Sequence, residues 1–426
     1  MSRRDAIIIG AGVAGLTCAS HLYRAGYDVL LIEASDDVGG RARTDVVNGF
    51  LLDRGLHTLL TTFPETRSEL DYHALRVGHV MDGARVYHDG VLHTLADPVR
   101  HPREALRSFR SPIGTTADRL RLTWMRTMLT RSRPEEILAR PEIPTWQALK
   151  SRWRFSDEMI QRYFRPLVGS YTFDPELNTS ARIFEILMRS LALGRAALPA
   201  EGIQAVPRQI AASIPRDRIL LNTTVEKIEI NRVMLGDGTI QQARAVIIAT
   251  TAAEASRLAE RPIDAKGVAA ACIYYAAPRA PFTEPYLLVN GSGRGPIMSL
   301  SVQTNIAPTY SPDQRALIAV VPFDPQYGTT SDRDIRRQLI AWFGAAAESW
   351  RHLRSYYLPY ALPDRTTNVV VPAGSPRIRE RLYMCGDHRH MPSLNGAMAS
   401  GRQVARAVAA DLGPPTSTRL LSTAAR

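Results

Sequence analysis

The sequence is poor in cysteine, and this shortage argues against two kinds of structural site. Cys18, Cys272 and Cys385 lie far apart and form no Cys-x-x-Cys pair, as a disulfide framework or a zinc knuckle would need. The simplest interpretation is a reducing, cytoplasmic location. No uninterrupted apolar run approaches the roughly eighteen residues of a membrane-spanning helix, so the sequence predicts none.

Lysine is nearly absent. It occurs only at Lys150, Lys227 and Lys266, so fifty of the 53 basic residues are arginine. The formal net charge is +12, but no block of consecutive basic residues is interleaved with aromatic ones, which argues against nucleic-acid binding. A chain of 426 residues is too long for one comfortable core, so we expect two domains that interleave in sequence.

Glycine is concentrated near the N-terminus. An apolar run at 6–9, the turn Gly10-x-Gly12-x-x-Gly15 and a second apolar run at 29–32 predict a strand–helix–strand unit. Gly10 permits the tight turn, Gly12 lets the backbone approach a pyrophosphate, and Gly15 lets helix and strand pack closely. Free N–H groups at the start of the helix attract the phosphates.

An acidic residue follows this unit at the expected place. Glu33 ends the second predicted strand, where a carboxylate accepts hydrogen bonds from ribose hydroxyls. A carboxylate also disfavours a ribose 2′-phosphate. These residues therefore leave two ligands open, NAD and FAD.

A second glycine pair lies just beyond. Gly39-Gly40 can bring the backbone against another phosphate face, with Arg41 and Arg43 as cations beside it. A site for nicotinamide alone has no need of this second clamp. The alternative is that both arginines are ordinary surface residues.

The segment "ASDDVGGRARTDVVNGFLLDRGLHTLL" at 34–60 resembles the flavin-containing amine oxidase, phytoene desaturase and protoporphyrinogen oxidase-like superfamily, in a bacterial branch. The resemblance implies FAD, with Gly40, Arg41 and Arg43 on the pyrophosphate side and backbone at 53–57 passing the isoalloxazine ring. It also implies that the backbone of Val225 meets the adenine. The FAD contacts that we predict are Gly10, Gly12, Ala14, Gly15, Glu33, Ala34, Gly40, Arg41, Arg43, Gly55, Leu56, Val225, Gly386, Asp387, Leu394, Asn395 and Ala397.

The middle of the chain, 98–199, has a helical pattern. The segment 117–131 places four apolar residues on one side of a helix and arginines spaced by sevens on another. Its apolar side is expected to pack on the core beneath a solvated face, and the alternative is a helix that lies on an anionic membrane. The apolar residues are Leu120, Trp124, Met125 and Met128, and the arginines are Arg119, Arg126 and Arg133.

A second helix is predicted over 181–194, as the wall of an apolar lobe. Phe184, Leu187, Met188 and Leu191 should face inward, and Arg182, Glu185 and Arg189 outward. Strands are then predicted at 219–221, 225–230 and 245–249, with a hairpin closed by Asp237-Gly238. A further sheet-rich stretch at 267–372 should form the floor of the substrate lobe with Tyr274, Tyr275, Tyr356, Tyr357 and Tyr360.

The segment "MCGDHRHMPSLNGAMASG" at 384–401 gathers possible metal ligands. We expect no metal, because His388 and His390 would project to different sides of an extended strand and no partner pair exists elsewhere. Cys385, in a buried strand at 382–385, is not expected to be a nucleophile either.

The same segment has a better interpretation as a strand-to-helix crossing. Gly386 allows close backbone approach, and Asp387 can hydrogen-bond a polyol chain. A helix beginning at Asn395 and Gly396 can direct its N–H groups at an anion. The superfamily closes with a similar strand, glycine-acid pair and helix beneath the flavin.

The chemistry implied is hydride transfer from a C–N or C–C bond of a largely apolar small molecule to flavin N5. Amine-oxidising relatives usually show a lysine near N5, but "GVAAACIYYAAP" carries alanines there and Lys266 lies upstream. The candidate catalytic residues are His57, Tyr360 and Ser393. A flavin-dependent isomerase without net redox turnover and a non-catalytic NAD-binding protein remain as alternatives.

The fold class that we predict is α/β: a Rossmann-type FAD-binding domain interleaved with a substrate domain made of a mixed sheet and a helical lobe. The FAD-binding domain should comprise 1–97, 200–264 and 373–412, and the substrate domain 98–199 and 265–372. Residues 413–426 are expected to be a flexible tail.

Overall fold

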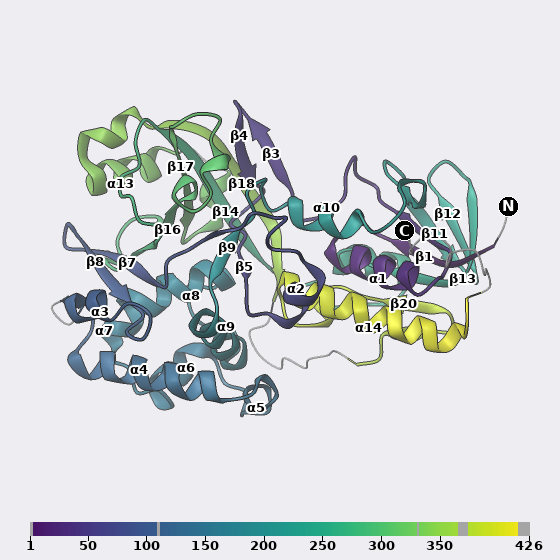
Figure 1. Cartoon of the computed structure of the whole chain (residues 1–426), viewed down its shortest axis with the longest axis horizontal. Coiled ribbons are helices and arrows are strands. Elements are labelled where there is room, and N and C mark those ends of the chain that lie inside the picture. Colours follow the sequence, from purple (N-terminus) through teal and green to yellow (C-terminus); the bar gives the residue numbers. More distant parts are fainter. Residues whose placement is uncertain (1–2, 109–110, 330–331, 365–373, 416–426) are drawn as a thin grey trace.

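The predicted strand–helix–strand unit opens the chain. Strand β1 spans Arg4–Ile9, helix α1 spans Val13–Arg24 and strand β2 spans Val29–Ile32. The two strands are parallel, with Ala6 opposite Val29. The structure is a computed structural model and describes residues 3–108, 111–329, 332–364 and 374–415 (Figure 1).

This unit belongs to an eight-stranded sheet. Its order is β10, β2, β1, β13, β12 and β11, with β20 beside β13 and β19 beside β20. Strands β10, β2, β1, β13 and β20 run parallel, and the predicted Asp237-Gly238 hairpin joins β12 to β13. The further bounds are β10 Ile219–Leu220, β11 Val225–Glu229, β12 Arg232–Leu235, β13 Ile240–Ile248, β19 Arg377–Arg379 and β20 Leu382–Met384.

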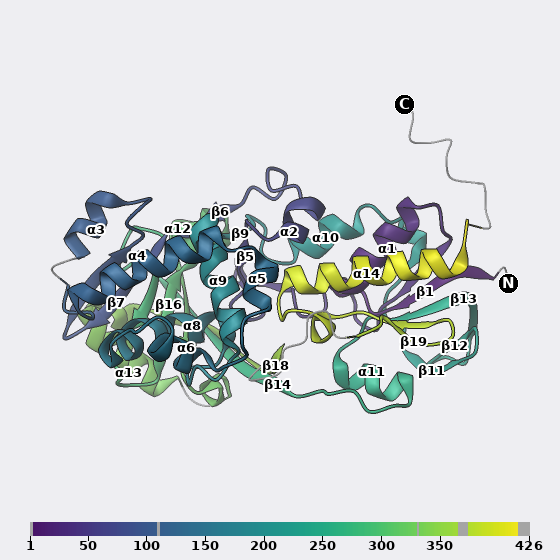
Figure 2. The same cartoon turned by 90° about the horizontal axis from the view of Figure 1, so that it is seen from below.

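Helices cover both faces of this sheet, so its central strands are apolar on both sides. Alternate residues of β1 face a core shared with α1 and α14 (Leu394–Leu412) or a core shared with α11 (Ala252–Ala259). Figure 2 shows α1 beside α14 and α11 on the other face. A Cβ on Gly401 would lie 2.3 Å from the carbonyl oxygen of Ala14, so this glycine lets the two helices cross closely. The N-terminal and C-terminal segments therefore pack together.

A seven-stranded mixed sheet forms the second half, in the order β18, β14, β17, β16, β15, β7 and β8. Of its described strands, only β15 and β7 pair in parallel. The predicted boundary at residue 97 needs correction, because β7 and β8 hydrogen-bond into this second sheet. The bounds are β7 Gly83–His88, β8 Val91–Ala96, β14 Gly267–Ala277, β15 Leu287–Asn290, β16 Ile297–Val302, β17 Ala316–Pro322 and β18 Arg351–Pro363; helices α12 (Gln303–Ile306) and α13 (Arg333–Phe343) accompany them.

The predicted helical lobe packs beneath this sheet (Figure 1). A π-helical turn, η1, runs directly into α8. The bounds are α3 Pro102–Ser108, α4 Thr116–Arg131, α5 Pro134–Leu138, α6 Thr145–Ser151, α7 Asp157–Met159, η1 Ile160–Phe164, α8 Arg165–Thr172 and α9 Ala181–Leu193.

The expected core stripe of α4 is wrong. Leu120, Trp124 and Met128 are 63%, 50% and 40% exposed, whereas Met125 and Leu129 are buried. Two of the expected outward arginines turn inward instead. Arg119 is 8% exposed, and the Nε of Arg126 lies 2.6 Å from Asp97. Hydrogen-bonded arginines therefore occupy much of the inward face of α4, and most of the predicted apolar stripe is exposed to solvent.

The outward direction predicted for Glu185 on α9 is also wrong. Its side chain is fully buried and lies 2.6 Å from Arg140 and 2.7 Å from Arg152. The indole N–H of Trp153 donates to the same carboxylate at 3.1 Å. Two cations and a third donor make burial of the charge tolerable.

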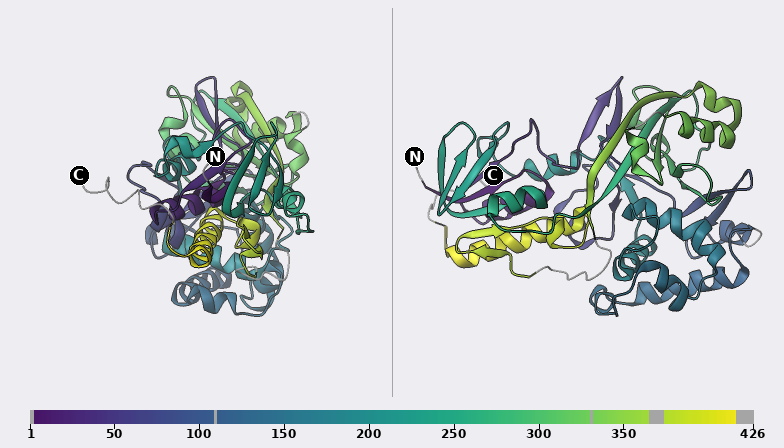
Figure 3. Two further views of the ribbon diagram at one scale, coloured as in Figure 1. Left: turned by 90° about the vertical axis from the view of Figure 1, so that its right-hand side faces the viewer. Right: turned by 180° about the vertical axis from the view of Figure 1, so that it is seen from behind.

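Short elements connect the two halves. Strands β3 (Thr44–Val47) and β4 (Phe50–Asp53) form a hairpin, and β5 (Leu59–Leu60), β9 (Ala196–Leu198) and β6 (Gly78–His79) form a small sheet. Helices α2 (Pro64–Glu69) and α10 (Ala205–Ala211) lie nearby. The right-hand view of Figure 3 shows the halves side by side, with the long strands β14 and β18 leading from one to the other.

The start of the expected tail is held against the first helix. The hydroxyl of Tyr27 donates to the carbonyl of Gly413 at 2.7 Å, and Pro415 lies next to Gly26. The prediction of a flexible tail from 413 is therefore wrong for 413–415, and 416–426 lie outside the described residues. Over the described ranges, no helix combines the length and apolarity needed to cross a bilayer.

Candidate functional site

A cavity of about 640 Å³ lies where the two halves meet, within the size range of small-molecule sites. Both ends of the chain contribute to its wall. Of the residues that we predicted as cofactor contacts or catalytic groups, all but Gly15 and Arg43 line it. The lining segments are 9–14, 32–34, 39–42, 54–66, 170–187, 223–225, 249–257, 358–363 and 386–397, each in part, together with Val268.

The first glycine turn is shaped by its backbone. Gly10 has φ of +105°, and a Cβ on Gly15 would lie 2.0 Å from the carbonyl oxygen of Gly10. A Cβ on Gly12 would instead meet no atom within 4 Å. Gly10 and Gly15 thus hold strand and helix together, while Gly12 opens onto the cavity.

The start of α1 presents its N–H groups to this space. Gly12 is the N-cap and supplies no side-chain acceptor, and the first turn carries no acidic residue. Val13 and Ala14 line the cavity. An uncapped helix N-terminus of this kind favours an anion.

Glu33 lies at the carboxyl end of β2. Its Oε2 accepts a hydrogen bond from the backbone N–H of Ala11 at 2.6 Å, and its Oε1 accepts one from the N–H of Ser35 at 3.0 Å. These bonds fix the carboxylate at the wall. Carboxylate oxygens have further acceptor capacity, so the side chain can still accept from a ligand hydroxyl.

The second glycine pair packs directly against the first turn. Gly39 and Gly40 have φ of +126° and +59°. The N–H of Gly39 donates to the carbonyl of Ala11 at 2.9 Å, and a Cβ on Gly40 would lie 3.3 Å from the Cα of Gly12. Two glycine turns therefore meet at one edge of the cavity, where backbone rather than side chains faces the space.

Arg41 joins three separate segments. Its guanidinium donates to Asp387 at 2.6 Å and to the carbonyl of Ala361 at 2.8 Å. It also lies over the ring of Tyr360, 5.4 Å from the centroid. Asp387 raises the pKa of Arg41 against the opposing effect of burial. The arginine thus fixes the C-terminal loop and β18 to the glycine loop.

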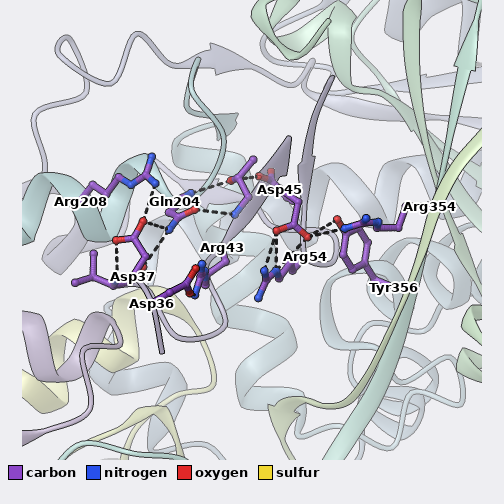
Figure 4. A network of polar contacts seen from close by, with 12 residues as sticks. Asp36, Asp37, Arg43, Asp45, Arg54, Gln204, Arg208, Arg354 and Tyr356 are labelled. Carbon is purple, nitrogen blue, oxygen red and sulfur yellow. Dashed lines mark hydrogen bonds and ion pairs between the residues drawn. The ribbon is translucent and has the colours of Figure 1, made fainter. Parts of the chain in front are cut away.

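Arg43 does not line the cavity, unlike its neighbour. Its guanidinium donates to Asp36 at 2.8 Å, and that hydrogen bond lowers the pKa of Asp36. Figure 4 shows the pair between two larger groups of polar contacts, one around Asp37 and one around Asp45. In the first group Asp37 accepts from Gln204 at 3.0 Å and from Arg208 at 2.7 Å, which holds the loop to α10.

Asp45 is the second centre in Figure 4. It accepts from Arg54 at 2.8 Å, from the hydroxyl of Tyr356 at 2.8 Å and from Arg354 at 3.3 Å. Burial raises the pKa of Asp45, but the hydrogen bonds from Arg54 and Tyr356 outweigh it and the net pKa is lowered. Arg54, which lines the cavity, is therefore already neutralised by the protein.

The segment after β4 carries a buried acid. Asp53 accepts from Thr44 at 2.6 Å, from the N–H of Ile203 at 2.9 Å and from the hydroxyl of Tyr310 at 2.8 Å. Burial raises the pKa of Asp53. The hydroxyl of Tyr274 donates to its backbone carbonyl at 3.0 Å. These bonds fix the strand end that leads to the cavity.

Gly55 and His57 follow on the cavity wall. Gly55 has φ of +109°, which favours glycine. The Nε2 of His57 lies 3.1 Å from the carbonyl oxygen of Arg54, so this nitrogen carries a proton. Burial lowers the pKa of His57, and the imidazole is neutral at neutral pH.

The C-terminal segment reaches the cavity through a loop and the start of α14. Asp387–Arg389 form a single 3₁₀ turn, so the expected extended conformation is wrong at His388, whereas His390, directly after the turn, has extended backbone. Gly386 has φ of +154°, and a Cβ there would lie 2.5 Å from the His388 ring. Among the described residues no group of histidine, cysteine and acidic side chains could hold a metal.

Ser393 is the N-cap of α14. Its hydroxyl accepts from the N–H of Gly396 at 3.0 Å and donates to the carbonyl of Met391 at 3.3 Å. Asn395 accepts from the backbone N–H of Glu65 at 2.9 Å. The hydroxyl proton of Ser393 is therefore already used in a hydrogen bond within the protein. This favours a structural role for Ser393 over a catalytic one.

Val225 marks the opposite end of the cavity. Arg257 of α11 donates to its carbonyl at 2.8 Å and to that of Glu226 at 2.7 Å. Arg257 also pairs with Glu254, and both side chains line the cavity. Arg257 thus fixes the backbone of the Val225 strand.

One part of the cavity wall is different in character. Segments 58–66, 170–187 and 391–397 line it with apolar and hydroxyl-bearing side chains and with Asn395, and none of these lining residues is charged. The charged lining residues are Glu33, Arg41, Arg54, Glu254, Arg257 and Asp387. Each of these is held by a partner in the protein, and no lysine is among the lining residues of the described chain.

Several wall residues were missed from the sequence. Tyr171, Phe173, Ile183 and Ile186 come from helices whose inward faces depend on neighbouring helices, and Arg257 acts only after α11 has docked. Of the five tyrosines expected in the floor, only Tyr360 lines the cavity. The spacing of apolar residues gave no signal for any of these positions.

Comparison with known proteins shows what the chain resembles. The family model "Flavin containing amine oxidoreductase" matches residues 13–409. Protoporphyrinogen oxidase 2 of Arabidopsis thaliana is 38% identical over 76 residues, 18% of this chain and 15% of that protein. Carotenoid 3,4-desaturase of Haloarcula japonica is 42% identical over 55 residues, 13% of this chain and 11% of that protein. The matches thus span only a small part of these relatives.

Solved structures match over nearly the whole chain. An oxidoreductase from Methanosarcina mazei has a TM-score of 0.74 and 19% identity, covering 94% of this chain and all of that one. At this identity the likeness establishes the fold. The predicted α/β fold class is thereby confirmed.

Proposed function

We propose, from the premise that this chain belongs to the flavin containing amine oxidoreductase family, that it dehydrogenates a neutral, largely apolar small molecule. Family membership makes the chain an FAD-dependent oxidoreductase, and FAD is its cofactor. The bond that is oxidised and the substrate class are the proposal. The bound flavin supplies the acceptor for a hydride.

The residues present fit FAD. Gly12 leaves an open cradle, Gly39 and Gly40 add a second stretch of bare backbone beside it, and the uncapped start of α1 faces the same space. Glu33 lies where it can accept from ribose hydroxyls. These features support a diphosphate held by backbone N–H groups, with the adenine toward Val225.

The other end of the ligand would lie between the segment 55–57 and the start of α14. Gly55 and Leu56 offer backbone, and Leu394, Asn395 and Ala397 present the positive end of a long helix. A helix N-terminus stabilises negative charge. The C-terminal helix would therefore favour an electron-rich ring, and Arg41 with Asp387 would hold the loop that positions it.

The observation that carries the substrate proposal is the distribution of charge. Among the described residues, those of segments 58–66 and 170–187 that line the cavity carry no charge, whereas the charged side chains of the wall lie in other segments. A protonated amine moved into such a space would lose hydration without gaining a counter-ion, at a cost of several kcal/mol. A neutral molecule meets no such penalty. This favours a C–C bond, or a C–N bond of an uncharged compound.

His57 is the one titratable side chain of the segment 55–57. Its lowered pKa keeps it neutral, and its Nε2 proton is directed at a backbone carbonyl. We assign it the role of orienting the ring-side backbone, and the apolar wall that of excluding water. Tyr360 stays a candidate through its contact with Arg41.

Anaerobic reduction of the purified flavoprotein tests the proposal. We expect a neutral polyene to bleach the flavin, and a protonated primary amine of similar size to act roughly a hundredfold more slowly. Faster reduction by the amine would contradict the substrate class. The isomerase and NAD-binding alternatives have no observation in their favour.

We also infer that α4 contacts an anionic membrane surface. Leu120, Trp124 and Met128 form an exposed line four residues apart, and Arg131 and Arg133 lie beside its end. Apolar residues with flanking arginines suit the interface of a bilayer. Co-sedimentation with anionic vesicles, lost in Trp124→Glu, is the expected result; no binding by the original chain would contradict it.

A further inference from the structure

A second, smaller cavity lies beside the first. Its volume is about 90 Å³, and it lies between α4, α8, α9 and the edge formed by β7 and β8. Tyr171 of α8 lines both cavities. No role in cofactor binding accounts for this second space.

A small apolar cluster lies beside both cavities. Leu60, Leu187 and Ala196 form a small buried cluster of their own, with Tyr171 and Leu191 packed against it. Leu60 and Leu187 line the first cavity, whereas Ala196 and Leu191 line the second. Residues of one small cluster thus border both cavities.

One face of the η1–α8 segment supplies the aromatic wall. Tyr163, Leu167 and Tyr171 are spaced by four residues and all line the second cavity. Tyr163 belongs to the π-helical turn η1, a distortion that is frequent at functional sites. The π-turn shifts the helix register and so helps set which side chains face the cavity.

Both tyrosine hydroxyls lack a partner. Tyr163 is 5% exposed, and within the described chain neither its hydroxyl nor that of Tyr171 makes a hydrogen bond. Burial raises the pKa of Tyr171 to about 12, and burial and nearby Asp97 raise that of Tyr163. Both are neutral hydroxyls, and each can donate to or accept from a polar group of a ligand in the cavity.

An unused acceptor lines the same cavity. The Oδ1 of Asp82 accepts from Arg100 at 2.8 Å, but its buried Oδ2 accepts no hydrogen bond in the described chain. The nearest cations to Oδ2 are His101 at 3.4 Å and Arg195 at 3.6 Å. The residues that line the cavity thus include two tyrosines whose hydroxyls make no hydrogen bond in the described chain, and Asp82, whose Oδ2 accepts no hydrogen bond but lies within ion-pair distance of two cations.

We propose that the second cavity is a subsite for the far end of the substrate, and that this end carries a hydroxyl group. A hydroxyl both accepts and donates, so it can satisfy Tyr163 or Tyr171 together with Asp82. The substrate is then an elongated apolar molecule that passes Tyr171, and this inference rests on the proposed function.

The volume limits the size of that end. Roughly 150 Å³ of apolar cavity holds a benzene ring, and the second cavity is smaller. It therefore accommodates a few heavy atoms, such as a short hydroxylated alkyl terminus, and excludes a second ring system.

Binding to the oxidised holoenzyme tests the subsite without turnover. Titration calorimetry would compare 1-alkanols of increasing length with 1-chloroalkanes of the same length. Beyond a threshold length the alkanol should bind about two- to tenfold more tightly, because only its hydroxyl meets the free groups. Tyr163→Phe should abolish that difference, and Ala192→Leu, which fills the cavity, should remove the gain from longer chains.

Matched controls are Tyr327→Phe and Ala117→Leu, at positions outside both cavities. If Ala192→Leu fails to fold, Ala192→Val serves instead. An alkanol preference that is equal at every length, or unchanged in Tyr163→Phe, would overturn the proposal. Slower association of alkanols of every length with Ala192→Leu would also overturn it, because that result would mean that ligands enter the main cavity through the second one. If alkanols show the expected threshold length but no neutral substrate reduces the flavin, the result would contradict the proposed function and leave the subsite proposal standing.

Discussion

The two ends of the main cavity are built by different means. At the nucleotide end, backbone shapes the wall: Gly10, Gly39 and Gly40 have positive φ values, and Gly12 leaves open space. At the substrate end, side chains of α8 and α9 shape it. Backbone turns are encoded by glycines at fixed spacing, whereas a side-chain wall depends on how helices dock. The glycine turns can therefore be predicted from the sequence, whereas the side chains of the helical wall can be identified only from the structure.

The largest effect is expected from a substitution that blocks FAD binding at the first glycine turn and leaves the rest of the cavity unchanged. Gly12 has φ of −70°, which any residue adopts, so Gly12→Val should fold. Its side chain would enter the cavity, and FAD affinity should fall about ten- to a hundredfold. Flavin absorbance after gel filtration, with circular dichroism for the fold, measures both.

Gly15→Ala is the matched contrast. A Cβ there would lie 2.0 Å from a backbone oxygen, so we expect loss of stability of about 3 kcal/mol or more. If Gly12→Val unfolded while Gly15→Ala stayed folded, the roles given to the two glycines would be reversed.

Substitution of the buried acid Glu185 should destabilise the helical lobe. Glu185→Gln leaves Arg140 and Arg152 without their counter-ion, and we expect the free energy of unfolding to fall by about 3 kcal/mol. Glu176→Gln removes a partly exposed partner of Arg165 and should change it by less than about 0.5 kcal/mol. If urea unfolding showed equal losses of stability in the two variants, the buried ion pairs of Glu185 would not be important for the stability of the lobe.

A smaller effect should appear with pH. Burial lowers the pKa of His57 below its ordinary value, so the unfolded chain binds this proton first as pH falls. The stabilising contribution is complete above pH of about 6.5 and is lost as pH falls toward the folded pKa, at up to about 1.4 kcal/mol per pH unit.

His57→Gln should flatten this dependence relative to the original chain. Burial also lowers the pKa of His79, His93, His352 and His390, so the difference between the two unfolding curves is the informative quantity. Parallel curves between pH 7 and 5 would contradict the buried, neutral state of His57.

The smallest effect is expected at Cys385. The thiol is fully buried directly after strand β20, and Cys385 is not among the lining residues. Cys385→Ser should therefore keep its FAD, at a small cost in stability. A folded but colourless variant would mean that this residue belongs to the site.

The same contrast explains what the sequence could predict. The strand–helix–strand unit, the Asp237-Gly238 hairpin and the strand before Gly386 follow from local periodicity and turn chemistry, and all are present. The direction of Glu185 could not be predicted, because its two arginines come from elsewhere in the chain. Leu120, Trp124 and Met128 have the spacing of a core stripe, but Arg126 is drawn inward by Asp97. Partners distant in sequence decided both cases.

Flavin stoichiometry tests the central claim most directly, namely that the two ends of the chain enclose one FAD between Glu33 and the start of α14. Denaturing a known amount of the purified protein and identifying the released nucleotide gives the ratio. We predict one FAD per chain in the original protein and a clear loss in Gly12→Val. A colourless protein that releases NAD, or no nucleotide after reconstitution with FAD, would contradict the account.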